Sequence, residues 1–507
     1  MMRTVVAALF LALCLPALAQ AQEEKDKAAA PPAPPIAEPQ VFTSRHEGRF
    51  NGQTVRYGVT AGETYLRNDK DEPIASIFSI AYVRDKGREE GPRPVTFVFN
   101  GGPGSASLWL HMGVFGPKRV NLPSDAEDDG APPYDIVDNP LAPLDVTDLV
   151  FIDPVGTGYS RPLGKAKGKD FWGVRQDADS LAEFIRLWVT RNKRWNAPKY
   201  IAGESYGTTR AAALADRLQD GFNGIAVNGV ILISAILDFQ SARFATGNQI
   251  PYIGFLPTYA ATHWYHNLKA GGAVSLEDHV ARARRFALEV YAPALLKGNR
   301  LSEEERALVR QELASLTGLG ERYLDDTDLR ISIARFTKEF GRAQGFTVGR
   351  FDSRFKGRDY DNAGERYDDD PSGYGIAGGF TAAVNHYMAS DLGVTIEREY
   401  KVLPRDPGRD WDWSMDGSGR GFGNVNVAPM LGEAMRENTD MRVLLAAGYY
   451  DLATPFFAAE NTMATNGIVA ERLVKTYYEA GHMMYLHRPS LEKLARDIRQ
   501  FIAAGGS

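Results

Sequence analysis

The serine at position 205 stands in a sequence that could make it a nucleophile. Gly203-Glu204-Ser205-Tyr206-Gly207 follows the apolar run from Lys199 to Ala202 and precedes helix-like sequence that begins at Thr208. A strand, the pattern Gly-x-Ser-x-Gly and a helix, in this order, are typical of a turn so tight that glycines must flank the serine. The pattern therefore predicts that the Ser205 hydroxyl projects from the end of a buried strand.

A serine hydroxyl attacks a carbonyl only when a base takes its proton and an acid orients that base. In α/β-hydrolases the order along the chain is serine, acid and histidine, each after a strand. Asp451 follows the run Arg442–Gly448, and His482 follows the run Leu473–Tyr478. We therefore expect Ser205, Asp451 and His482 to form a catalytic triad. Taken singly, His482 could be a surface histidine and Asp451 a turn carboxylate.

A glycine-rich loop directly follows another apolar run. Asn100-Gly101-Gly102-Pro103-Gly104 comes after Val95–Phe99. Glycines at this point let backbone N–H groups face the nucleophile, so the loop can form half of an oxyanion hole, with the N–H of Tyr206 as the other half. A plain tight turn is the alternative, but such a turn needs neither three glycines nor a proline.

Four motifs occur in order along the chain: Asn100–Gly104, Asp153–Ser160, Gly203–Gly207 and Gly481–Met483. Over residues 94–240 and 440–490 this series resembles the serine carboxypeptidase family. The resemblance implies an enzyme that removes C-terminal residues from peptides by acyl transfer to serine. By motif position, Ser205 would be the nucleophile, His482 the general base and then acid, and Asp451 the residue that orients His482.

The resemblance also implies roles for the residues around the nucleophile. Gly102 and Tyr206 would donate the oxyanion N–H groups. The terminal carboxylate of the substrate would be held by Asn100, the backbone of Gly101 and the side chain of Glu204.

Glu204 and position 114 bear on the pH at which such a site would work. A carboxylate can hold another carboxylate only if one of them is protonated, which favours acid pH, whereas His482 must be neutral to act as base. Val114 stands where the family has a second glutamate. This departure puts both the carboxylate grip and the acid optimum in doubt, and Glu204 could merely pack beside the turn.

Two other classes of function stay open. An esterase or another peptidase of the same fold would carry the same triad, and proline-releasing aminopeptidases share a Gly-Gly-Pro-Gly loop, typically with histidine at the position of Asn100. A non-catalytic binding protein is the rival from outside enzymes, and an intact triad argues against it.

The predicted fold is α/β, a doubly wound and mostly parallel sheet of the α/β-hydrolase type. Short runs at 54–59 and 77–82 predict N-terminal antiparallel strands, and buried runs at 95–99, 149–152, 200–202 and 230–233 predict parallel ones. We expect a first core part at 41–239, an inserted helical cap at 240–430 and a second core part at 431–507. Within the cap, helices are expected at 276–296 and after the capping box that begins at Ser302, and loop elsewhere.

The N-terminal residues predict export. Residues 1–21 have a basic start, a short apolar run and Ala-x-Ala cleavage sites, typical of a secretory signal, and 22–40 form a Pro/Ala-rich linker. Location would be periplasmic or extracellular, with no membrane anchor after cleavage.

Composition limits the partners. The only cysteine, Cys14, lies in the expected signal, and the net charge of −6 gives no case for nucleic acid. Peptides are the expected partners, and no cofactor or metal is expected, because the acidic run at 359–370 matches a calcium loop poorly. The oligomeric state is open.

Overall fold

The computed structural model of the chain describes residues 36–85, 92–127, 130–220, 224–374, 376–415 and 421–505. One compact unit spans Pro39–Ser507. The expected signal and the linker up to residue 35 lie outside the described residues. Within the described ranges, no helix combines the length and the apolar character needed to cross a bilayer.

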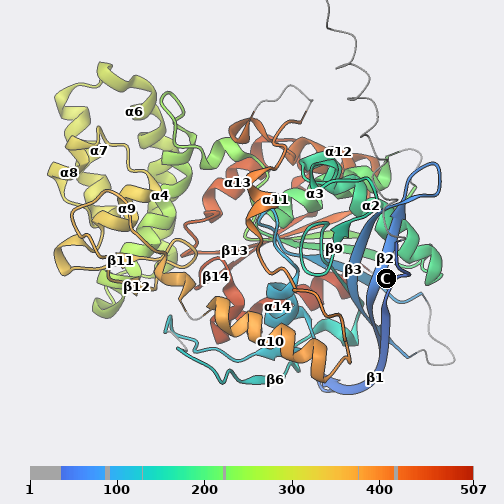
Figure 1. Cartoon of the computed structure of the whole chain (residues 1–507). Coiled ribbons are helices and arrows are strands. Elements are labelled where there is room, and N and C mark those ends of the chain that lie inside the picture. The colour runs from blue at the N-terminus through green and yellow to red at the C-terminus, as the bar shows by residue number, and fades with distance from the viewer. Residues whose placement is uncertain are drawn as a thin grey trace, which may run out of the picture. The chain divides into compact units, whose positions relative to one another are not determined.

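A ten-stranded sheet forms the centre of this unit, in the order β1-β2-β3-β7-β4-β9-β10-β13-β14, with β8 paired to β3 (Figure 1). The strands are β1 (Val41–Phe50), β2 (Gln53–Arg67), β3 (Pro73–Arg84), β4 (Val95–Phe99), β7 (Asp148–Ile152), β8 (Arg161–Pro162), β9 (Lys199–Glu204), β10 (Gly229–Ile233), β13 (Arg442–Gly448) and β14 (Leu473–Tyr478). β1 to β3 pair antiparallel, β3 meets β7 antiparallel, and β7 to β14 run parallel. The predicted α/β-hydrolase sheet with its N-terminal antiparallel segment is confirmed.

The parallel strands are apolar because both of their faces are covered. Ile201 of β9 packs into the hydrophobic cluster on one face, while its neighbours Tyr200 and Ala202 pack into the cluster on the other. Side chains alternate between the faces of a strand, so a strand buried on both sides needs a continuous apolar run.

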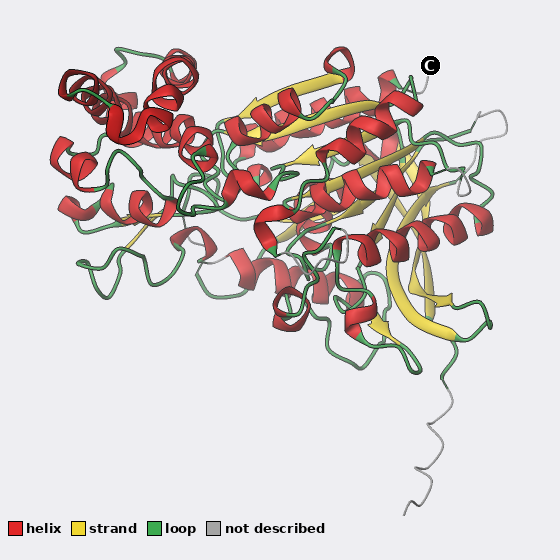
Figure 2. Ribbon diagram, turned by 90° about the horizontal axis from the view of Figure 1, so that it is seen from above, coloured by secondary structure: helices red, strands yellow, loops and turns green. Residues whose placement is uncertain are grey.

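Helices cover both faces of the sheet (Figure 2). One face carries α2 (Val174–Arg191), α3 (Tyr206–Gln219) and α12 (Ala428–Glu437), whose buried side chains join the cluster of Ile201. The other face carries α14 (Arg488–Ala504) and α10 (Ile376–Ser390). A further core helix, α13 (Phe456–Thr465), follows β13. Short elements lie between β4 and β7: α1 (Leu108–Leu110), the π-helix η1 (His111–Phe115), β5 (Lys118–Val120) and β6 (Ile136–Asp138).

The chain between β10 and β13 is largely helical, and most of its helices lie together beyond the β13–β14 side of the sheet (Figure 1). They are α4 (Ile250–His263), the π-helix η5 (Trp264–Leu268), α5 (Leu276–Phe286), α6 (Ala292–Lys297), α7 (Glu303–Thr317), α8 (Glu321–Asp326) and α9 (Ile333–Glu339). The strands β11 (Thr347–Val348) and β12 (Lys356–Gly357) follow and pair with each other. The short helix α11 (Arg405–Arg409) comes later in the chain. The predicted capping box is confirmed, since Ser302 and Glu305 bond to each other's backbone N–H groups. The cap limits of 240 and 430 stay a prediction.

The expectation of loop in the rest of this region is wrong at α4, α8, α9, α10 and α11. In α10 the glycines hide the helical pattern, since the sequence reads Ile376-Ala377-Gly378-Gly379. A Cβ at Gly379 would lie 3.0 Å from Leu122. The helix therefore uses glycine for close packing against the core, and that tertiary contact outweighs glycine's poor helix propensity.

Candidate active site

The three predicted catalytic residues follow neighbouring parallel strands. Ser205 comes directly after β9, Asp451 follows β13, and His482 follows β14. β10 separates β9 from β13, and β13 pairs with β14. The carboxyl ends of parallel strands meet at one edge of a sheet, so the topology brings all three to the same edge.

Ser205 lies in a strained turn between β9 and α3. Its φ of 61° and ψ of −130° are rarely adopted by a residue with a side chain. A Cβ at Gly203 would lie 2.1 Å from the carbonyl oxygen of Gly207, so no larger residue fits there. The backbone N–H of Ser205 donates to the carbonyl of Ile233 at 3.0 Å, which fixes the turn to the end of β10.

Asp451 and His482 form a buried hydrogen-bonded pair. Nδ1 of His482 lies 2.8 Å from Oδ2 of Asp451, and the two residues are 4% and 0% exposed. Burial lowers the pKa of His482, but the charge and hydrogen bond of Asp451 outweigh it, with a further contribution from Glu204, and raise that pKa above 6.5. A proton held on Nδ1 leaves Nε2 as the basic nitrogen.

Thr454 orients the carboxylate of this pair, a role that the motifs did not reveal. Its backbone N–H donates to Oδ1 of Asp451 at 2.9 Å, and its hydroxyl lies 2.8 Å from Oδ2. The N–H of Ala453 donates to Oδ1 as well, at 2.8 Å. The spacing Asp-x-x-Thr resembles an ordinary turn cap, so only its place after β13 could have singled Thr454 out.

The histidine loop is tied to the end of β10, next to the nucleophile turn. The hydroxyl of Ser234 donates to the carbonyl of His482 at 2.6 Å. Among the described residues, the Ser205 hydroxyl forms no hydrogen bond of its own, so its bond to the imidazole is not made in this structure. Nucleophile–base hydrogen bonds often tighten only when substrate binds.

The glycine-rich loop lies directly against the turn that carries Ser205. A Cβ at Gly101 would lie 2.5 Å from the backbone nitrogen of Tyr206, and Gly102 has a φ of 102°. These positions require glycine, one because of the close approach and the other because of its backbone conformation. The loop therefore lies in close contact with the first residue of α3.

Arg210 contacts both the glycine-rich loop and the start of α3. Its Nη1 donates to the carbonyl of Asn100, and its Nε donates to the carboxylate of Asp177 at 2.6 Å. The guanidinium carbon lies 5.3 Å from the ring centres of both Phe99 and Tyr206. The charge is fully buried, so its pairing with Asp177 is what makes this position tolerable.

Glu204 is buried beside Ser205 and accepts hydrogen bonds from two neutral donors. Nδ2 of Asn100 donates to its Oε2 at 2.8 Å, and the hydroxyl of Tyr485 donates to the same oxygen at 2.9 Å. Burial raises the pKa of Glu204 to about 7, even though nearby His482 and the two hydrogen bonds favour the ionised form. Glu204 is therefore a mixture of acid and carboxylate at neutral pH.

Tyr485 lies beside Glu204, and in the described part of the chain no second carboxylate bonds to that residue. Val114 is buried in η1 and offers no polar group. At the neighbouring Gly113, a Cβ would lie 2.5 Å from the Tyr485 ring, so glycine makes room for that ring. Tyr485 is not part of any motif, and its place three residues after His482 is the one sequence signal that points to it.

The acidic run at 359–370 is held by a lysine. Nζ of Lys338 bonds to Oδ2 of Asp359 and to the carbonyl of Asp361. In the described ranges, no group of three or more histidine, cysteine, aspartate or glutamate side chains could hold a metal ion.

Comparison with known proteins agrees with this arrangement. The family model for serine carboxypeptidase matches residues 65–265. Serine carboxypeptidase-like 13 of Arabidopsis thaliana is 27% identical over 186 residues, which are 36% of this chain and 40% of that protein. Serine carboxypeptidase ctsa-3.1 of Caenorhabditis elegans is 31% identical over 134 residues, 26% of this chain and 21% of that protein. The matches thus span less than half of these relatives.

The fold extends beyond the matched segment. The crystal structure of Kex1(Δ)p, a prohormone-processing carboxypeptidase from Saccharomyces cerevisiae, superposes with a TM-score of 0.52 at 14% identity, over 88% of this chain and 91% of that one. The chain is similar in sequence to the serine carboxypeptidases over residues 65–265, and it has the α/β-hydrolase fold.

Proposed function

We propose that the chain is an exported serine carboxypeptidase, with Ser205 as nucleophile, His482 as general acid and base, and Asp451 as the residue that orients His482. One observation carries the proposal. The buried Asp451–His482 hydrogen bond of 2.8 Å lies at the sheet edge where Ser205 sits in a strained turn. Its substrates would be peptides.

The reaction would proceed through an acyl-enzyme. Oγ of Ser205 attacks the last peptide carbonyl while Nε2 of His482 takes the hydroxyl proton, and the imidazolium is stabilised by Asp451. The N–H groups of Gly102 and Tyr206 bind the oxyanion. When the C–N bond breaks, His482 gives its proton to the leaving amino group. Water then attacks the ester, losing a proton to His482, which returns it to Ser205.

The terminal carboxylate would be received beside the nucleophile by Asn100, Gly101 and Glu204. Glu204 can donate a hydrogen bond to it only while protonated, and its pKa of about 7 keeps it protonated up to neutral pH. His482 must be neutral in the same range. The two requirements overlap in a band near neutrality, so we expect a bell-shaped dependence of kcat/KM on pH.

The test compares two peptides that differ only at the C-terminus, one a free acid and the other an amide. Mass spectrometry of the digests shows which end is trimmed, and we expect the acid to be trimmed much faster. Ser205→Ala should lower kcat by roughly a millionfold if the triad acts as a unit. Substantial activity left in this variant, or no labelling of Ser205 by a fluorophosphonate, would remove the enzyme assignment.

An esterase or another peptidase is the second candidate, and Val114 favours it. Without a second glutamate, the residues that would bind the substrate's terminal carboxylate include one acidic residue fewer than in the family. Equal rates on the acid and the amide would support this candidate and reject a carboxypeptidase.

A further inference from the structure

A short segment of the inserted region lies against both loops that carry the Asp451–His482 pair. We call Arg350–Arg354 the bridging segment. The carbonyl of Arg350 accepts the N–H of Leu452 at 3.0 Å, and the carbonyl of Phe351 accepts the N–H of His482 at 2.6 Å. The inserted region thus bonds directly to the residue after Asp451 and to the catalytic histidine itself.

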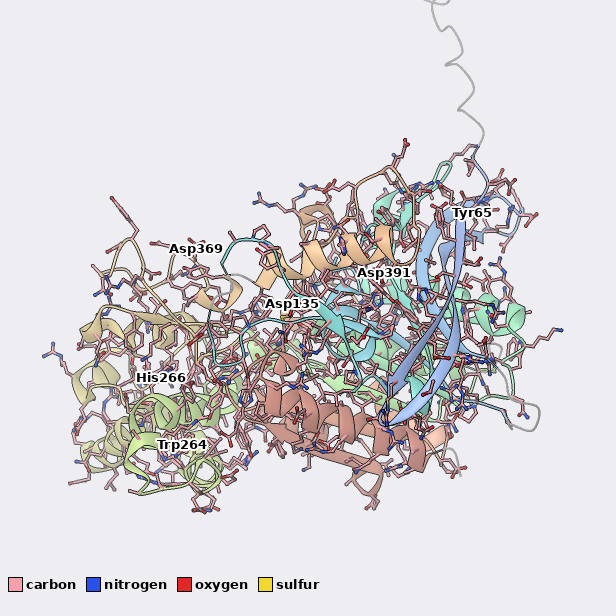
Figure 3. All side chains as sticks on the ribbon, turned by 90° about the horizontal axis from the view of Figure 1, so that it is seen from below. Tyr65, Asp135, Trp264, His266, Asp369 and Asp391 are labelled. Carbon is pink, nitrogen blue, oxygen red and sulfur yellow. The ribbon has the colours of Figure 1, made fainter. Side chains whose placement is uncertain are left out.

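Further contacts hold the bridging segment in place. The side chain of Asp352 accepts the N–H of Gly481 at 3.1 Å and pairs with Arg354 at 2.6 Å, both buried. Ser353 bonds to the inserted helices, through its hydroxyl to Thr262 at 2.6 Å and through its carbonyl to Nε2 of His266 at 2.7 Å; Figure 3 labels His266 among those helices. The backbone of this segment therefore has a fixed position relative to Asp451 and His482.

The side chains of Phe351 and Arg350 lie in series beside the imidazole of His482, with the Phe351 ring tilted by 50° to it. The ring of Phe351 lies 5.2 Å from that of His482, centre to centre, and the guanidinium carbon of Arg350 lies 5.0 Å from the Phe351 ring centre. The guanidinium is therefore within about 10 Å of the imidazole. Phe351 is 36% exposed, so part of its ring faces solvent.

The guanidinium of Arg350 has no protein counter-ion in the described part of the chain. Asp370 accepts the backbone N–H of Arg350 at 3.0 Å, but the two side chains form no ion pair. The positive charge of Arg350 lowers the pKa of His482, although less strongly than Asp451 raises it. An unpaired guanidinium stacked on an aromatic ring is suited to bind a carboxylate.

A C-terminal substrate would carry its carboxylate close to Ser205 and His482, and Arg350 lies next to His482 through the Phe351 ring. With its last peptide carbonyl at Ser205, the terminal carboxylate lies one residue further, roughly 3.8 Å along the chain. Glu204 can bind it only while protonated, and Val114 supplies no second acid. We propose that the Arg350 guanidinium binds the C-terminal carboxylate of the substrate. This proposal rests on the carboxypeptidase function proposed above.

The test measures kcat and KM on the acid and amide peptides for Arg350→Gln and Arg350→Lys. We expect Arg350→Gln to raise KM for the acid by roughly ten- to hundredfold, the loss typical of a charge-assisted hydrogen bond, and to leave KM for the amide unchanged. Arg350→Lys should restore part of the loss. Arg322→Gln is the matched control, because Arg322 lies exposed on α8 and pairs with Asp326, and its change removes the same charge.

The outcomes separate the two proposals. If the unmodified protein prefers the acid and Arg350→Gln keeps that preference, the role of Arg350 is wrong and the carboxypeptidase stands. Equal losses on acid and amide would assign Arg350 a structural role only, and thermal unfolding of both variants would then show a lower Tm. If the unmodified protein shows no preference for the acid, both proposals fail.

Discussion

Glu204→Gln tests the electrostatics of the site through folding stability alone. Glutamine keeps the shape and can still accept hydrogen bonds from Asn100 and Tyr485, but it does not titrate. Burial raises the pKa of Glu204 from 4.5 to about 7. The folded protein therefore holds this proton over a pH range in which the unfolded chain has lost it, so this glutamate makes the unfolding free energy fall as pH rises from about 4.5 to 7.

The magnitude follows from the size of the shift. At about 1.36 kcal/mol for each pKa unit, the whole shift corresponds to roughly 3 kcal/mol, most of which falls between pH 5 and pH 8. We expect the stability of Glu204→Gln relative to the unmodified protein to increase by this amount between the two pH values. Urea unfolding at pH 5 and pH 8 measures it.

Glu63→Gln is the matched control. Burial raises the pKa of Glu63, but the N–H of Gln40 and the guanidinium groups of Arg161 and Arg398 outweigh it, so its pKa is lowered below 4.5. Its stabilisation is complete above the unfolded value and is lost only as pH falls further, so its removal should cost the same at pH 5 and pH 8. A stability difference for Glu204→Gln that is equally independent of pH would refute the raised pKa.

Two further predictions concern the same network. Asp451→Asn should lower kcat by about ten thousandfold with little change in KM, because His482 would no longer hold its proton on Nδ1. Steady-state kinetics measure this loss, and a decrease in kcat of less than tenfold would contradict the role of Asp451. Tyr485→Phe removes a hydrogen bond that favours ionised Glu204, so the pH above which KM for the acid peptide rises should move upward. A pH series on the acid and amide peptides measures that shift, and a shift in the opposite direction would contradict the assignment.

The parallel sheet could be predicted because its strands are buried on both faces and leave continuous apolar runs. The turn at Ser205 and the glycine-rich loop could also be predicted, since Gly101 and Gly203 stand where a Cβ would collide with backbone atoms. Local sequence dictates such positions. The Asp451–His482 pair could be predicted from order alone, because each residue follows a strand of the same sheet.

The remainder of the site depends on contacts between distant segments. Tyr485 reaches Glu204 over a separation of 281 residues, and Asp352 reaches Gly481 over 129. No periodicity or motif in either segment predicts such a contact. α10 was missed for the same reason, because its glycines serve a tertiary contact that outweighs local propensity.

The buried Arg210–Asp177 pair has a consequence for how the sequence can change over time. Replacing either partner alone leaves a buried charge without its counter-ion near Ser205, which typically lowers the unfolding free energy by about 3–5 kcal/mol. Replacing both by apolar residues of similar volume is often neutral. Single-step drift at positions 177 and 210 is therefore blocked, and the two should be retained or replaced together. A homologue in which both residues are replaced would need another hydrogen-bond donor for the carbonyl of Asn100.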